Sequence, residues 1–176
     1  MERNSTSILV GMVKHYFESQ IKIPDVPYFG MVDKEIGYVK LNSFTQTAAS
    51  DVKSAIEKLR KEGMSKLVLD LRDNGGGLLI EAVKIVNFFV PKNTVVVSTK
   101  GRVKEENRVY TTLEEPIDTQ IPLTVLVDGG SASASEIVAG SLQDLDRAVI
   151  IGQTSFGKGL VQRTYDMKYG SKMKLT

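Results

Sequence analysis

Residues 127–140, VDGGSASASEIVAG, decide the fold class. An apolar run that is typical of a buried strand ends at Asp128, and the Gly129-Gly130 pair permits a sharp turn. The small residues that follow lead into a predicted helix over residues 131–144. Backbone N–H groups and the helix dipole favour negative charge at such a helix start. The segment therefore predicts a strand–turn–helix unit that exposes a serine at a helix N-terminus.

Elsewhere along the chain, predicted strands alternate with predicted helices. The strands are expected over residues 36–41, 66–71, 94–99, 122–128, 148–152 and 160–167, and the helices over residues 7–20, 48–62 and 78–90. Residues 7–20 also contain β-branched side chains, so a strand is the alternative prediction for this segment. Residues 101–116 are polar and charged, which predicts an exposed hairpin or loop. This order of elements indicates an α/β domain.

The candidate domain boundary lies in IKIPDVPYFG, residues 21–30. Pro24 and Pro27 rule out a regular helix, so this segment is expected to be an extended connector. Residues 1–30 are then the remnant of a preceding domain or a linker, and residues 31–176 form the main domain. The last residues, KMKLT, look like the opening of a strand, so we expect this domain to be truncated at its C-terminus.

Composition excludes several classes of chemistry. The chain has 176 residues with a net charge of +2, which gives no reason to expect a nucleic-acid partner. It has no cysteine, so disulfides, thiolate catalysis and thiolate metal sites are excluded. The sequence also predicts no metal site and no other cofactor. A Ser-His-Asp triad would have to use the one histidine, His15, which we expect to be structural or exposed. No apolar run is long enough to predict a membrane-spanning segment in this chain.

Ser133 and Lys158 are the candidate reactive side chains, and each also has an ordinary structural explanation. A serine at a helix start can act as a nucleophile while the next amide stabilises an oxyanion. The pair Ser133 and Glu136 also forms a capping-box pattern, which occurs wherever helices begin. Lys158 lies between Gly157 and Gly159, which permit close packing around an amine. A lysine acts as a base only where burial or nearby positive charge lowers its pKa, and the alternative is a solvated lysine on a surface loop.

A third segment, LDLRDNGGG at residues 69–77, joins a buried strand to a helix through three glycines. Such a turn can present backbone N–H groups to an anion, which makes it a candidate half of an oxyanion hole. One alternative is a plain strand–helix turn. Another is a phosphate-binding loop, but neither the Lys-Ser/Thr of a P-loop nor a G-x-G-x-x-G spacing is present.

Together, LDLRDNGGG, VDGGSASASEIVAG, LQD and GQTSFGKGLVQ resemble the signature blocks of C-terminal processing (tail-specific) serine peptidases. The blocks follow in order across residues 35–176, and IGYVKLNSF resembles the start of that family's catalytic core. The resemblance implies the roles of the following residues: Ser133 as nucleophile, Lys158 as general base, Gln162 as the residue that orients the lysine, Asp144 as a possible supporting acid, and the amides of Ala134 and of Gly76, or Gly75 as second choice, as the oxyanion hole.

The same resemblance implies a crotonase/Clp-protease-like superfold, in which a curved β-sheet is flanked by helices. It implies endoproteolysis near the C-terminal tails of polypeptide substrates, without a cofactor, in the bacterial periplasm or cell envelope. A homo-oligomer is possible. Members of the family usually carry a PDZ domain before the core, and residues 1–30 are too short for one, so we expect them to contain its end.

The residues support a Ser–Lys mechanism on their own, since neutral Lys158 can take the proton of Ser133 as the hydroxyl attacks a peptide carbonyl. An acyl-enzyme then forms and is hydrolysed by water. One alternative is a peptide-binding or scaffold protein that keeps the fold without catalysis. Another is an acyl-thioester enzyme of the same superfold, which would not need both Lys158 and Gln162. A third is a peptidase core that is inactive in this truncated form.

Overall fold

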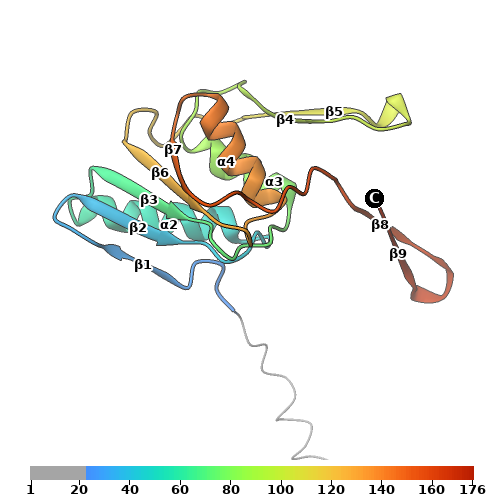
Figure 1. The fold of residues 1–176 in the computed structure, drawn as a ribbon, viewed down its shortest axis with the longest axis horizontal. Coiled ribbons are helices and arrows are strands. Elements are labelled where there is room, and N and C mark those ends of the chain that lie inside the picture. The colour runs from blue at the N-terminus through green and yellow to red at the C-terminus, as the bar shows by residue number, and fades with distance from the viewer. Residues whose placement is uncertain (1–22) are drawn as a thin grey trace, which may run out of the picture.

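The computed structural model describes residues 23–176, and its centre is a five-stranded sheet (Figure 1). The strand order is β1-β2-β3-β6-β7, in which β1 is antiparallel to β2 and the other neighbours are parallel. The strands are β1 Tyr28–Met31, β2 Ile36–Lys40, β3 Lys66–Asp70, β6 Leu123–Val127 and β7 Val149–Gly152. The α/β class predicted from the sequence is confirmed. The predicted element over residues 7–20 and His15 lie outside the described residues.

Three helices connect the parallel strands: α2 Ala48–Lys61, α3 Leu79–Asn87 and α4 Ala134–Asp144. Burial alternates along β2 and β6, where Val39 and Val125 are fully buried whereas their neighbours are half-buried, and in β3 Leu67 and Leu69 are buried on either side of the half-buried Val68. The buried side chains of the sheet and of the helices form one core. The helices therefore cover one face of the sheet, and α3 packs against both α2 and α4. In residues 23–176, no helix has the length and apolar character needed to cross a bilayer.

Two hairpins extend from this body (Figure 1). One pairs β4 Val95–Thr99 with β5 Arg108–Thr111, with the short helix η1 Lys104–Glu106 between them. The polar segment over residues 101–116 therefore belongs to a hairpin, as one of the two predicted options. The other hairpin pairs β8 Arg163–Asp166 with β9 Lys172–Leu175 around η2 Lys168–Gly170. The strand predicted over residues 160–167 begins only at β8, and residues 153–162 have no regular structure.

β1 is a strand that the sequence did not predict, since it lies inside the expected connector over residues 21–30. It pairs with β2 in the main sheet, where Phe29 lies opposite Val39. Just before it, Asp25 is buried and its carboxylate accepts hydrogen bonds from the hydroxyls of Thr45 and Thr47. Asp25 and β1 therefore contact β2 and the residues before α2, and residue 30, where the sequence places the boundary, lies within β1.

Candidate active site

Ser133 is the N-cap residue of α4, at the end of the turn that follows β6. Its backbone has φ 56° and ψ −109°, in the left-handed region that a residue with a side chain rarely adopts. Such strain persists only where the surrounding structure holds it, and it clusters at functional sites. The side chain of Ser133 is half-buried. The structure thus places this serine at the exposed helix start that the sequence predicted.

The glycine turn after β3 lies directly beside Ser133. Gly76 has φ 98°, and a Cβ atom there would lie 2.6 Å from the carbonyl oxygen of Ala132 and 2.9 Å from both the amide nitrogen of Ala134 and the Cβ of Ser133. Only a glycine fits this approach. The turn therefore packs against the start of α4 at Gly76.

The backbone amides of this region are not equally available. Gly76 N donates a 2.9 Å hydrogen bond to Oδ1 of Asn74. Among the described residues, the amides of Gly75 and Ala134 have no hydrogen-bond acceptor. A buried N–H group normally has a partner, so the open amide of Ala134, a fully buried residue next to the strained serine, is available to a ligand, whereas Gly75 is exposed to solvent. Of the two glycines, Gly75 is the one that can donate to an oxyanion without losing another bond.

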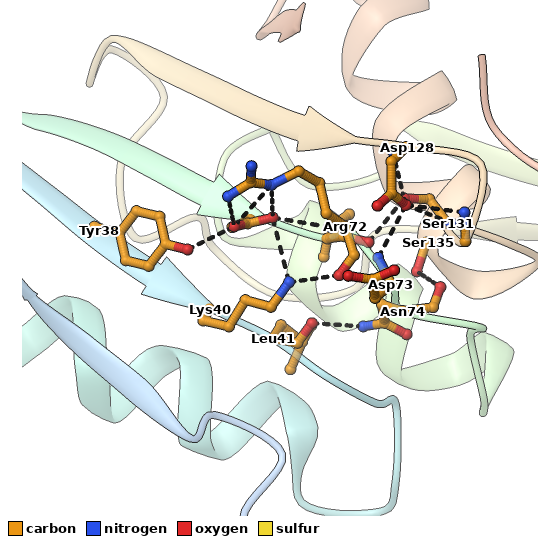
Figure 2. A network of polar contacts seen from close by, with 12 residues as sticks. Tyr38, Lys40, Leu41, Arg72, Asp73, Asn74, Asp128, Ser131 and Ser135 are labelled. Atoms are coloured by element: carbon orange, nitrogen blue, oxygen red, sulfur yellow. Dashed lines mark hydrogen bonds and ion pairs between the residues drawn. The ribbon is translucent and has the colours of Figure 1, made fainter. Parts of the chain in front are cut away.

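Buried hydroxyls join the glycine turn to the start of α4 (Figure 2). Ser131 Oγ donates to the carbonyl of Leu71, and Ser135 Oγ donates to the carbonyl of Asn74, both at 2.8 Å. Both serines are fully buried, unlike Ser133. The outer serines of SASAS therefore hold the two segments together, whereas the middle one, Ser133, forms a capping box with Glu136. The sequence pattern alone did not separate these roles.

Asn74 and Asp128 strengthen this junction (Figure 2). Asn74 is fully buried, and its Nδ2 donates to the carbonyl of Leu41 at 2.8 Å. The carboxylate of Asp128 accepts from the amides of Asp73 and Gly130, both at 2.9 Å. The hydrogen bond from the Asp73 amide is the largest cause that lowers the pKa of Asp128. The turn is therefore fixed to β2 on one side and to the end of β6 on the other.

A second polar network lies at the ends of β2 and β3, around the fully buried Asp70 (Figure 2). Asp70 accepts hydrogen bonds from Tyr38 Oη at 2.5 Å and from Arg72 Nη2 at 2.6 Å, and Lys40 Nζ lies 3.4 Å away. Burial alone would raise the pKa of Asp70, but the bonds from Arg72 and Tyr38 hold it well below its usual range. The network lines a cavity of about 470 Å³ together with Tyr28, Asp73 and Asp128. The charged groups of this network, Asp70, Arg72 and Lys40, all have partners. We therefore interpret the network as structural support for the turn.

Lys158 lies between β7 and β8, in a segment that forms neither a helix nor a strand. Its Nζ donates a 3.4 Å hydrogen bond to Oε1 of Gln162, whose Nε2 donates to Thr176 Oγ1 at 3.3 Å. In the described part of the chain, no hydrogen bond joins Lys158 Nζ to Ser133. The structure thus places Gln162 within hydrogen-bond distance of the lysine amine, whereas the amine does not hydrogen-bond to the serine.

Glu136, on the first turn of α4, joins the lysine segment to the serine through its carboxylate. It accepts hydrogen bonds from the amides of Ser133 at 2.7 Å, Gly157 at 2.7 Å and Lys158 at 2.9 Å, and from Ser155 Oγ at 2.8 Å. Burial raises the pKa of Glu136, but these hydrogen bonds outweigh it and lower the pKa below its usual value. The sequence signalled only the capping box; the bonds to residues 155–158 depend on the tertiary structure.

Asp144 is the last residue of α4, at the end opposite Ser133. It is exposed, and its carboxylate has no hydrogen bond or ion pair among the described residues. The helix rise of 1.5 Å per residue separates it from the helix start by about 15 Å along the axis. Asp144 therefore does not reach Ser133 in this structure. Within residues 23–176, no cluster of three His, Cys, Asp or Glu side chains could hold a metal ion.

Known proteins share this sequence and fold. Residues 35–176 match the model of Peptidase family S41. A probable CtpA-like serine protease of Staphylococcus saprophyticus is 42% identical over 81% of this chain and 29% of its own length. The chloroplastic carboxyl-terminal-processing peptidase 2 of Arabidopsis thaliana is 40% identical over 88% of this chain and 30% of its own length.

The solved structure of a photosystem II D1 C-terminal processing protease superposes with a TM-score of 0.69 and 38% identity, over 80% of this chain and 36% of that one. A putative S41 protease from Bacteroides fragilis has the same fold, with a TM-score of 0.74 over 89% of this chain and 45% of that one, at 22% identity. The chain spans about a third of the length of the curated relatives. These matches confirm the resemblance found in the sequence, and the chain belongs to Peptidase family S41.

Proposed function

We propose that this chain is the Ser–Lys catalytic core of a serine endopeptidase that cleaves polypeptides near their C-terminal tails. The observation that carries the proposal is Ser133 in a strained conformation at the start of α4, next to the open amide of Ala134 and against the glycine turn at Gly76. Membership of Peptidase family S41 and the names of the relatives support the reaction class.

In the proposed mechanism, the neutral amine of Lys158 takes the hydroxyl proton of Ser133 as Oγ attacks the peptide carbonyl. The amides of Ala134 and Gly75 donate to the oxygen that becomes negative. The protonated lysine then gives its proton to the leaving amine, and the C–N bond breaks to leave an acyl-serine. Water hydrolyses this ester and restores the serine. Gln162 orients the lysine by accepting its hydrogen bond.

A second candidate is a peptide-binding module without catalysis, favoured by one observation. Lys158 Nζ donates to Gln162 and not to Ser133 among the described residues. Catalytic hydrogen bonds are often long before substrate binds and tighten in the complex, so this arrangement also fits a resting peptidase. Reactivity at Ser133 separates the two candidates.

The test is labelling of the chain with a fluorophosphonate, followed by mass spectrometry to find the modified residue. We expect Ser133→Ala to abolish labelling and Lys158→Ala to slow it by about 10²–10⁴-fold, the usual contribution of a general base. Ser54→Ala and Lys53→Ala, at exposed positions of α2, are matched controls. Unreduced labelling of Ser133→Ala, or no labelling of the unmodified chain, would refute the mechanism and leave the binding module.

We further propose an extracytoplasmic setting and a homo-oligomeric assembly. Both rest on the resemblance to C-terminal processing peptidases. Fractionation of the source cells would test the setting, since recovery with the cytoplasmic fraction contradicts it. Light scattering would test the oligomer, since a mass of 19.4 kDa corresponds to one chain.

A further inference from the structure

We infer that Glu136 is a positioning residue for the reaction, which holds the backbone of Lys158 at a fixed place beside the backbone of Ser133. The inference rests on the proposed Ser–Lys mechanism and adds a residue to it. Glu136 itself does not touch the reacting atoms. It acts through the two residues that do.

Each of the two carboxylate oxygens of Glu136 accepts two hydrogen bonds. Oε2 accepts from the amide of Ser133 at 2.7 Å and from the amide of Lys158 at 2.9 Å. Oε1 accepts from the amide of Gly157 at 2.7 Å and from Ser155 Oγ at 2.8 Å. One oxygen atom therefore connects the two candidate catalytic residues through their backbones, and hydrogen bonds to a charged acceptor are stronger than neutral ones.

A capping box alone does not explain this arrangement. A capping box requires the bond from the Ser133 amide, whereas the other three donors come from residues 155–158, which belong to no helix or strand. In the described part of the chain, the remaining hydrogen bond between these residues and the start of α4 is from the Phe156 amide to the carbonyl of Ser131, at 2.9 Å. Glu136 thus supplies most of the polar contacts that attach the lysine segment to the helix.

Attachment of the backbone matters because a lysine amine lies at the end of a flexible four-carbon chain. If the Cα of Lys158 moves, the volume that its Nζ can reach moves with it. A misplacement of about 1 Å in a reacting group can cost about 10²-fold in rate. The hydrogen bonds to Glu136 keep its carboxylate ionised at neutral pH, so that all four acceptor positions persist there.

Glu136→Gln is the decisive variant, because it keeps the size of the side chain but replaces one oxygen with an NH₂ group that cannot accept. In one orientation the amides of Ser133 and Lys158 lose their acceptor, and in the other Gly157 and Ser155 do. Glu57→Gln, at an exposed position of α2, is the matched control. Ser155→Ala removes one donor and leaves three, so its effect should be smaller.

Two measurements report on these variants. The first is the fluorophosphonate reaction at Ser133, separated into the maximal inactivation rate and the concentration that gives half of it. We expect Glu136→Gln to lower the maximal rate about 10–100-fold, with the half-maximal concentration unchanged. The second is amide hydrogen exchange, which we expect to become about tenfold faster at Gly157 and Lys158 and to stay unchanged in β3 and β6.

Unchanged labelling kinetics in Glu136→Gln would overturn the inference, even if exchange became faster, because Glu136 would then be only a structural anchor. Unchanged exchange at Gly157 and Lys158 would overturn it as well. Failure of the proposed function looks different, since the unmodified chain would then not be labelled at Ser133 at all. A loss of labelling in Glu57→Gln equal to that in Glu136→Gln would attribute the effect to charge alone and would also refute the positioning role.

Discussion

Two neighbouring glycines of the turn beside Ser133 should respond in opposite ways to the same substitution. A Cβ on Gly76 would meet three atoms of the Ser133 segment at 2.6–2.9 Å, whereas a Cβ on Gly75 would meet nothing within 4 Å. Gly76 also has φ 98°, while Gly75 does not have a positive φ. Gly76→Ala should therefore disrupt the site, and Gly75→Ala should leave it intact.

The expected magnitude follows from two contributions. An alanine held in the left-handed region costs about 1–2 kcal/mol. Overlap with the fixed backbone at Ala132 and Ala134 forces shifts that cost about 1–3 kcal/mol. Gly76→Ala should thus lower the free energy of unfolding by about 2–5 kcal/mol. Gly75→Ala should change it by about 1 kcal/mol or less, with a small gain from the stiffer unfolded chain.

Urea denaturation of both variants and of the unmodified chain measures these values. Fluorophosphonate labelling adds a second comparison, because Gly75→Ala keeps the amide that we assign to the oxyanion hole, whereas Gly76→Ala displaces the Ser133 segment. If Gly76→Ala were as stable as the unmodified chain, or if Gly75→Ala lost as much stability as Gly76→Ala, the close approach of the turn to Ser133 would be wrong.

Three further predictions concern the polar contacts around the site. The pKa values of Asp70 and Glu136 are lowered in the folded protein, so the stability that these carboxylates contribute is complete above their unfolded pKa values of about 4 and is lost as pH falls toward their folded pKa values. The urea concentration at the unfolding midpoint should therefore fall as pH drops below about 4. This fall should be less steep in Asp70→Asn. Asn74→Ala leaves the buried carbonyl of Leu41 and the half-buried amide of Gly76 without these partners and should cost about 2–4 kcal/mol in urea denaturation, whereas a cost below about 1 kcal/mol would contradict the contacts. Tyr38→Phe removes one of several hydrogen bonds to Asp70 and should lower the free energy of unfolding by about 1 kcal/mol in urea denaturation. An unchanged free energy of unfolding would show that this hydrogen bond is absent.

The sequence was sufficient for elements whose pattern is local. Helix α2 has its buried residues on one face and ends next to Gly63, and strands β3 and β6 are short apolar runs, so periodicity and turn residues predict them. Strand β1 was missed because its four residues follow two prolines and carry no alternation. It is a strand only because β2 lies beside it, which no local pattern encodes.

The candidate site shows the same limit. A helix start after two glycines predicts an exposed serine, and Ser133 lies there. The choice among the glycine amides could not be made in advance, because it depends on the side chain of Asn74, which takes the amide of Gly76. The wider role of Glu136 was hidden for the same reason, since its partners at residues 155–158 lie about twenty positions along the chain.

Two separate sets of contacts hold Ser133 and the backbone of Lys158, and they leave the side chain of Lys158 free to rotate. Buried hydroxyls and Asn74 fix the glycine turn against the start of α4, and Glu136 fixes the backbone of Lys158 to the same helix end. These contacts are buried or charge-assisted, so they should reorganise little when substrate binds. Among residues 23–176, the amine of Lys158 is held only by a 3.4 Å hydrogen bond to Gln162. We therefore expect rotation of this side chain, rather than refolding of its loop, to be the step that brings the base onto the serine.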